Sequence, residues 1–169
     1  MLNSAQGFQT NVWGPAAWLF LHCVSLNYNP RRNKAETKMF FENLAYVLPC
    51  GACRDNYKHT IKNSKSLALN DAVFETRESL ALWLFRLHNY VTRCQTGGVP
   101  HYKDTKQEFG RMVRFYDQFR AKCSVTNVTK HKGGCTVPLH KNGVRMRSMI
   151  RIRPLSRTVN KDSVSINEF

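Results

Sequence analysis

The sequence has few acidic residues, few cysteines and no long apolar run. Its 169 residues include 11 Asp and Glu against 26 Lys and Arg, which gives a net charge of +15. The most apolar N-terminal stretch, residues 12–26, contains Pro15 and His22 and has neither a basic start nor a cleavage site. The sequence therefore predicts neither a membrane span nor a secretory signal. Six cysteines are too few for a scaffold built from disulfides.

The positive charge is densest after residue 123. Residues 124–169 carry nine Lys and Arg but only two Asp and Glu, and apolar and basic residues alternate over 144–153. This alternation favours a short strand or an extended arm. We expect two parts: a globular domain over 1–123 and a flexible basic tail over 124–169. The tail is either a solvated extension or an arm for an anionic partner such as nucleic acid or an acidic protein.

Helical periodicity dominates the first 123 residues. Leu80, Leu84 and Leu87 form one apolar stripe, Pro15 suits the first turn of a helix, and Asn33 and Glu36 have capping-box spacing. Convincing strand patterns are absent before residue 124. The predicted fold is all-α, a four-helix bundle with a short fifth helix. The expected helices are 15–26, 33–47, 50–62, 76–94 and 105–119.

One close pair of cysteines, Cys50 and Cys53, follows Pro49 at the expected start of a helix. Unpaired N–H groups at a helix N-terminus favour a thiolate, and Arg54 adds positive charge. The pair therefore suits disulfide exchange. Two alternatives are an inert pair and half of a zinc site. The other zinc ligands would have to come from a scattered set: Cys94, Cys123, His131 and Cys135.

Aromatic and imidazole side chains form a second constellation. Trp18 and His22 lie four residues apart on one helix face, and His88 with Asn89 lies on the most apolar helix. These side chains either pack in the core or sandwich a planar cofactor. Because the chain has no Gly-x-Gly-x-x-Gly motif, a flavin would not sit on a Rossmann fold.

Four sequence blocks together resemble the Erv/ALR family of FAD-linked sulfhydryl oxidases. They are WGPAAWLFLH at 13–22, YNP at 28–30, LPCGAC at 48–53 and HNYV at 88–91. Their order and spacing match over about residues 13–123, and the form of the cysteine block looks most like members encoded by large DNA viruses.

The resemblance implies a helical bundle that holds FAD noncovalently, often as a homodimer through its first helices. Cys50 would meet thiol-containing protein substrates, and Cys53 would lie next to the flavin. Electrons would pass to molecular oxygen and give hydrogen peroxide. Tyr102 and Lys103 would contact the nucleotide end. The remaining residues expected to line FAD are Gly14, Trp18, His22, Tyr28, His88 and Asn89.

The chain departs from the family pattern at several positions. Thr92 stands where the family has a second Asn, and Phe109 or Phe115 must replace a Trp. We expect Cys23 and Cys94 to be small hydrophobes on apolar helix faces. Cys123 and Cys135 could form a shuttle pair, form a structural disulfide or remain free thiols.

The sequence leaves two hypotheses about the function open. The first is a thiol oxidase in a host cytoplasm or virion, or in the mitochondrial intermembrane space. The second is a zinc-stabilised basic protein that binds nucleic acid.

Overall fold

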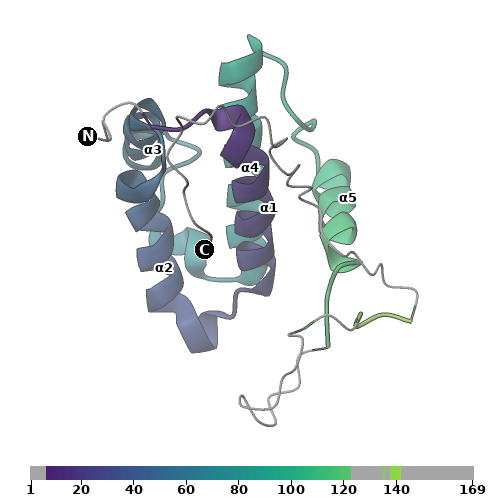
Figure 1. The fold of residues 1–169 in the computed structure, drawn as a ribbon. Helices are drawn as coiled ribbons and strands as arrows, with labels where there is room; N and C mark the ends of the chain where they lie inside the picture. The colour runs from purple at the N-terminus through teal and green to yellow at the C-terminus, as the bar shows by residue number, and fades with distance from the viewer. Residues whose placement is uncertain (1–6, 123–134, 136–137, 142–169) are drawn as a thin grey trace, which may run out of the picture.

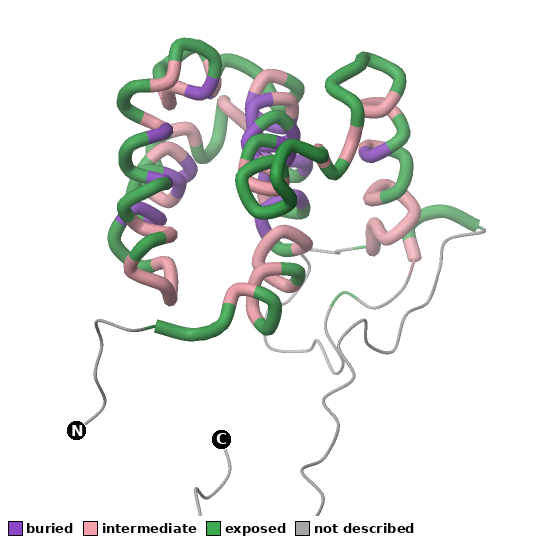
Figure 2. The backbone as a smooth tube through the Cα atoms, turned by 90° about the horizontal axis from the view of Figure 1, so that it is seen from above, coloured by how far each residue is buried: buried purple, intermediate pink, exposed green. Residues whose placement is uncertain are grey.

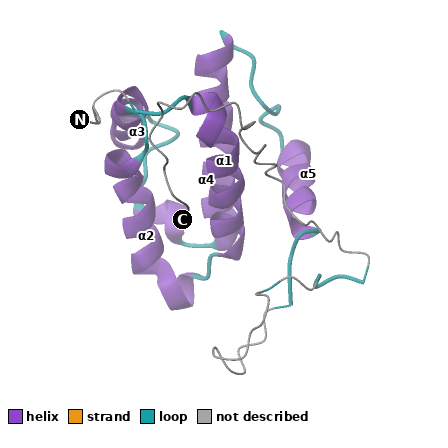
Figure 3. Ribbon diagram, viewed as in Figure 1, coloured by secondary structure: helices purple, strands orange, loops and turns teal. Residues whose placement is uncertain are grey.

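The computed structural model describes residues 7–122, 135 and 138–141, and this part of the chain is helical (Figures 1 and 3). The prediction of an all-α fold is confirmed. Within these residues the only extended pairing is an isolated bridge between Ala121 and Pro138. The elements in chain order are α1 (Thr10–Asn27), α2 (Pro30–Val47), α3 (Gly51–Asn63), the 3-10 helix η1 (Asp71–Phe74), α4 (Arg77–Thr96) and α5 (Lys106–Asp117).

Helices α1 and α4 pack against each other at the centre, with α2 and α3 on one side and α5 on the other (Figure 1). Buried residues lie on the helix sides that face one another (Figure 2). The larger core cluster joins α1, α2, α3, η1 and α4, and includes Phe41, Phe74 and Leu84. A smaller cluster around Phe85 and Met112 attaches α5 to α4 and to the end of α1.

Helix α1 begins earlier than the sequence predicted. It starts at Thr10, so Pro15 lies inside it and not in its first turn. Proline lacks an N–H and therefore leaves the Asn11 carbonyl without its helical partner. The helix nevertheless continues to Asn27, and its buried face packs on α4. Tertiary packing therefore outweighs one missing hydrogen bond.

The predicted helix start at Asn33 is confirmed in part, because non-helical backbone angles at Asn33 separate the first turn of α2 from the rest of the helix. Its side chain, however, makes a different bond from that of the predicted capping box. The helix begins at Pro30, and the side chain of Asn29 caps it by accepting from the Arg31 N–H at 3.1 Å. Asn33 instead marks a kink with φ −144° and ψ 35°, where its side-chain oxygen accepts from the Asn29 N–H at 3.2 Å. Proline at the first helical position fixes the earlier start.

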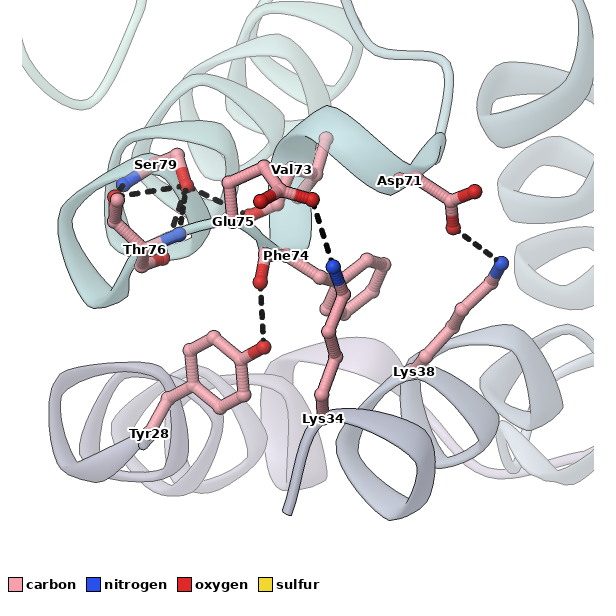
Figure 4. Close-up of polar contacts among 9 residues, drawn as sticks. All are labelled: Tyr28, Lys34, Lys38, Asp71, Val73, Phe74, Glu75, Thr76 and Ser79. Carbon is pink, nitrogen blue, oxygen red and sulfur yellow. Dashed lines mark hydrogen bonds and ion pairs between the residues drawn. The ribbon is translucent and has the colours of Figure 1, made fainter. Parts of the chain in front are cut away.

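The segment between α3 and α4 contains η1, which the sequence did not predict. Figure 4 shows η1 tied to α2 by ion pairs from Lys34 to Glu75 at 2.7 Å and from Lys38 to Asp71 at 2.6 Å. Tyr28 adds a buried bond, because its hydroxyl donates to the Phe74 carbonyl at 2.6 Å. These contacts hold the α3–α4 connection, which contributes Phe74 to the larger core cluster, against α2.

Helices α4 and α5 begin where the sequence predicted. Thr76 and Ser79 form a reciprocal capping box at the start of α4, and Thr105 caps α5 by accepting from the Glu108 N–H. At the other end of α4, Gly97 adopts the left-handed conformation with φ +69°, which glycine tolerates. The caps thus fix both ends of the helix that carries His88.

A short piece of the predicted basic tail packs on α5. Leu139 donates its N–H to the Arg120 carbonyl at 2.8 Å, next to the Ala121–Pro138 bridge. His140 lies 3.0 Å from the carboxylate of Asp117. Residues 138–140 are therefore tied to the helical domain, and the predicted arm over 144–153 lies outside the described residues.

Candidate dithiol and cofactor site

Cys50 and Cys53 lie at the first turn of α3, as the sequence predicted. Cys50 is the N-cap residue, with extended backbone angles (φ −151°, ψ 124°), and its sulfur accepts from the Cys53 N–H at 3.3 Å. Both residues are partly exposed free thiols in this structure. The pair therefore combines a helix N-terminus with sulfurs one turn apart, the arrangement that disulfide exchange requires.

The two thiols have different acidities. The Cys53 thiol, backbone N–H groups and the Arg54 charge stabilise the Cys50 thiolate, so the pKa of Cys50 is lowered even though burial opposes this. Burial, followed by the hydrogen bond to Cys50, raises the pKa of Cys53 to about 11. In the reduced pair Cys50 is thus the readier nucleophile, and Cys53 keeps its proton.

A cavity of about 800 Å³ opens beside this pair. Its volume lies within the range of sites for small molecules and cofactors. Cys53 lines the cavity, whereas Cys50 lies outside its lining. Helices α1, α3 and α4 supply most of the wall, and the α4–α5 connection supplies His101 and Tyr102. Of the two cysteines, therefore, only Cys53 contributes to the cavity wall.

A stack of flat side chains forms part of the cavity wall. The ring of Trp18 lies 4.1 Å from that of His88 at an angle of 11°, and His101 stacks on His88 at 4.8 Å. His22 is buried behind them, with its Nε2 3.1 Å from Nδ1 of His88. Such a wall suits the face of a planar aromatic ligand.

His22, which is buried, and His88, which is partly buried, are both neutral at pH 7. Burial, with the nearby His101, lowers the pKa of His22 to about 4. Burial and the other two histidines lower the pKa of His88 to about 3. Nδ1 of His22 has no hydrogen-bond partner. The aromatic cavity is therefore flanked by neutral imidazoles, which can both donate and accept hydrogen bonds and so fit an uncharged planar ring.

The predicted cofactor residues differ in where they lie relative to the cavity. Gly14, Trp18, Cys53, His88 and Tyr102 line the cavity. His22 touches its wall through the bond to His88.

The other three predicted residues lie elsewhere. Tyr28 is bound to η1 (Figure 4), and Lys103 lies outside the cavity lining. Asn89 is buried on a neighbouring face of α4, where its side-chain oxygen accepts from the Tyr102 N–H at 2.8 Å. Asn89 therefore orders the connection that carries His101 and Tyr102.

The cavity residues that the sequence did not mark as cofactor-binding include Trp13, His101 and Tyr116. Trp13 belongs to the quoted block at 13–22, so its position was a usable signal. His101 lies just after a glycine-containing turn, and no periodicity marks it. Of the two candidates to replace the family Trp, Phe115 lines the cavity, and Phe109 packs in the smaller core cluster.

The prediction for Cys23 and Cys94 is wrong in one respect, because both residues are exposed and not buried in apolar faces. Cys94 lines the large cavity. Cys123 lies outside the described residues, and Cys135 is disulfide-bonded. Among the described residues, no three His, Cys, Asp or Glu side chains are grouped so that they could bind a metal ion. No helix in this part of the chain is long and apolar enough to cross a membrane.

The helical bundle, with its Cys-x-x-Cys pair beside an aromatic cavity, defines a class of protein in which a dithiol lies next to a binding site for a planar cofactor. Comparison with known proteins agrees with this class. The model of the Erv1 / Alr family matches residues 15–110, and the chain belongs to that family.

Three relatives share this region. A probable FAD-linked sulfhydryl oxidase, R368, of Acanthamoeba polyphaga mimivirus is 40% identical over 82 residues, which cover 47% of this chain and 55% of the relative. The FAD-linked sulfhydryl oxidase ERV1 of Arabidopsis thaliana is 30% identical over 83 residues, or 47% and 40% of the two chains. The mitochondrial enzyme ERV1 of Saccharomyces cerevisiae is 28% identical over 83 residues, or 47% and 41%. The matched region thus spans about half the length of these relatives.

Proposed function

We propose that this protein is an FAD-dependent thiol oxidase that forms disulfide bonds in protein substrates through Cys50 and Cys53. The observation that carries the proposal is the position of the pair, with Cys53 in the wall of an aromatic cavity of about 800 Å³ and Cys50 at the N-cap of the same helix. The three relatives are named FAD-linked sulfhydryl oxidases, which supports the same cofactor and reaction.

The exchange step uses only sulfur chemistry. A substrate thiolate attacks the Cys50 sulfur of the oxidised pair, the Cys50–Cys53 bond breaks, and the electron pair of that bond leaves on Cys53. A second substrate thiolate then attacks the mixed disulfide and releases a substrate disulfide. The Cys50–Cys53 pair is left as a dithiol, two electrons richer.

The side chains of the cavity would hold and orient the cofactor. The mutually stacked rings of Trp18 and His88 line one part of the cavity, and Tyr102 lines the part formed by the α4–α5 connection. Bound FAD supplies a two-electron acceptor beside Cys53, with oxygen as the final acceptor and hydrogen peroxide as its product. The protein contributes position and neutral imidazoles.

Serine substitutions test the assignment. Cys53→Ser should keep FAD and abolish oxidation of dithiothreitol, because it removes the sulfur in the cavity wall. Cys50→Ser should also abolish turnover, but it leaves the Cys53 sulfur free to give a long-wavelength absorbance with bound flavin. Cys23→Ser is the matched control and should keep the wild-type rate, since Cys23 lies outside the cavity. Wild-type rates in both active-pair variants would show that the redox pair is elsewhere.

We further propose a homodimer through α1 and α2. Phe20 on α1 is 57% exposed, and Met39 on α2 is 59% exposed. Phe20 lies edge-on to Phe40 at 6.1 Å, so the two helices share an apolar surface. Sedimentation of the wild type and of Phe20→Glu tests this, because a charge there should convert a dimer to a monomer.

The basic tail is proposed to bind an anionic partner, and the setting is proposed to be a host cytoplasm or virion, or the mitochondrial intermembrane space. The net charge of +15 supports an anionic partner. A viral relative and a mitochondrial relative are each compatible with one of the two settings. Salt-dependent binding to DNA tests the tail, since phosphate contacts release counterions.

A further inference from the structure

The residues before α1 cross the turn that carries Cys50. We call residues 7–9 the strap. The Phe8 N–H donates to the Pro49 carbonyl at 2.7 Å, and the Phe8 carbonyl accepts from the indole N–H of Trp13 at 3.2 Å. The Phe8 side chain is 73% exposed, so the strap is held here by its backbone and not by burial of the ring.

Gly7 makes the closest approach. Its backbone has φ +66°, and a Cβ at this position would lie 2.5 Å from the Pro49 oxygen and 2.7 Å from the Cys50 Cα. Any other L-residue would meet both a backbone clash and a disfavoured φ. Glycine at position 7 therefore permits the close contact with the turn that carries Cys50.

The held carbonyl belongs to the peptide that leads into Cys50. On the same turn, the Cys50 N–H donates to the Leu48 carbonyl at 2.8 Å, and the Arg54 guanidinium donates to that carbonyl at 2.7 Å. The Leu48 carbonyl is thus fixed from within the turn and from α3, whereas the Pro49 carbonyl is fixed from outside by the strap. Together these bonds hold Cys50 in the extended conformation that places its sulfur over the Cys53 N–H.

We propose that the strap is a positioning element for Cys50, which sets the reactivity of its sulfur by holding the Pro49 carbonyl. This inference deepens the proposed thiol oxidase function and rests on it for its biological meaning. Phe8 acts through its backbone N–H alone, and Gly7 acts by permitting the close approach. Neither residue touches the reacting sulfur through a side chain.

The strap acts by geometry and not by charge. The ionisable groups that act on Cys50 are Cys53 and Arg54, both on α3. The strap itself consists of Gly7, Phe8 and Gln9, none of which titrates. A change in the acidity of Cys50 after a strap mutation would therefore report a displaced sulfur.

Two substitutions at one position isolate the backbone bond. Phe8→Pro and Phe8→Ala both remove the exposed ring, but only proline also removes the N–H that binds Pro49. Iodoacetamide alkylation of Cys50 in the reduced full-length protein, followed by peptide mass spectrometry across pH 5–10, gives the titration midpoint of this one thiol.

We expect Phe8→Ala to match the wild type. In Phe8→Pro the midpoint should rise by about one pH unit, because a displaced Cys50 thiolate would lose the hydrogen bond from the Cys53 N–H, and one hydrogen bond to a charged group has this scale. The rate at pH 7 should fall about threefold, because a more basic thiolate is rarer but more nucleophilic. Gly7→Ala should behave as Phe8→Pro does. Equal midpoints in the two Phe8 variants, or a wild-type profile in Gly7→Ala, would overturn the proposal.

Flavin content and dithiothreitol oxidation separate this inference from the function it rests on. If the wild type binds no FAD and oxidises no thiol, the proposed function fails, yet the alkylation comparison still decides whether the strap positions Cys50. If the Phe8→Pro protein loses its flavin or its helical content, the strap is a general structural support, and the local role is refuted.

Discussion

Tyr28 is the residue at which the sequence-based expectation and the structure differ most clearly. The family resemblance places Tyr28 at the cofactor, but its side chain is buried and its hydroxyl donates to the Phe74 carbonyl on η1. Tyr28→Phe removes this donor and leaves a buried carbonyl without its partner. We expect a loss of about 1–3 kcal/mol in the free energy of unfolding, with no loss of FAD.

The assay is thermal unfolding followed by circular dichroism, with flavin content measured by absorbance in the same preparation. A loss of this size lowers the melting temperature by roughly 4–12 °C in a domain of this length. Tyr46→Phe is the matched control, because Tyr46 is 63% exposed and should change neither quantity. A Tyr28→Phe protein with the wild-type melting temperature and weakened flavin binding would refute our reading of Figure 4.

Three further predictions concern other parts of the molecule. Because burial lowers the pKa of His22 to about 4 and of His88 to about 3, from an ordinary value of 6.5, the unfolded chain binds more protons between pH 4 and 6.5. The free energy of unfolding should therefore fall as pH drops from 7 to 5, by about 2 kcal/mol per histidine, and His22→Leu should show a shallower dependence in denaturant titrations; equal slopes would contradict this. Saturating FAD should slow alkylation of Cys94, which lines the cavity, and should leave Cys23 unchanged, so equal protection of both thiols would be evidence against the proposed cofactor position. Truncation after Lys141 should keep the melting temperature, whereas truncation after Cys123 should lower it by removing the contacts of Leu139 and His140. Both truncated proteins should keep dithiothreitol oxidation and lose salt-sensitive DNA binding. Loss of flavin in the protein truncated after Lys141 would show that residues after 141 support the cavity.

Sequence patterns predicted the helices well where local chemistry decides the outcome. The start of α4 follows from Thr76, and the start of α3 follows from the proline and cysteine at its N-terminus. The start of α1 was predicted too late, because tertiary packing extends the helix before Pro15. At α2 the turn before Asn33 was missed, although Asn33 does interrupt the helix there. Local propensity is a weak guide when an apolar helix face has a partner.

The candidate site was predictable to the extent that a helix face groups its residues. Trp18 and His22 lie on one face of α1, and both reach the site. Tyr28 and Lys103 follow bends in the chain, whose direction no periodicity reveals. His101 enters the site because Asn89 binds the next backbone N–H, and such a long-range contact leaves no pattern in the sequence.

The cap on α3 has a thermodynamic consequence. Its acceptor is the sulfur of Cys50, so under the proposed function the helix is capped by an atom that changes its bonding in every catalytic cycle. A sulfur shared in a disulfide is a weaker acceptor than a thiolate, and an N-cap contributes about 1 kcal/mol. Since 1.4 kcal/mol corresponds to 30 mV for a two-electron couple, preferential capping of the reduced form makes the pair more oxidising by about 20 mV. The folding stability of α3 and the reduction potential of the pair are therefore linked, and a substitution that alters the first turn of the helix changes both.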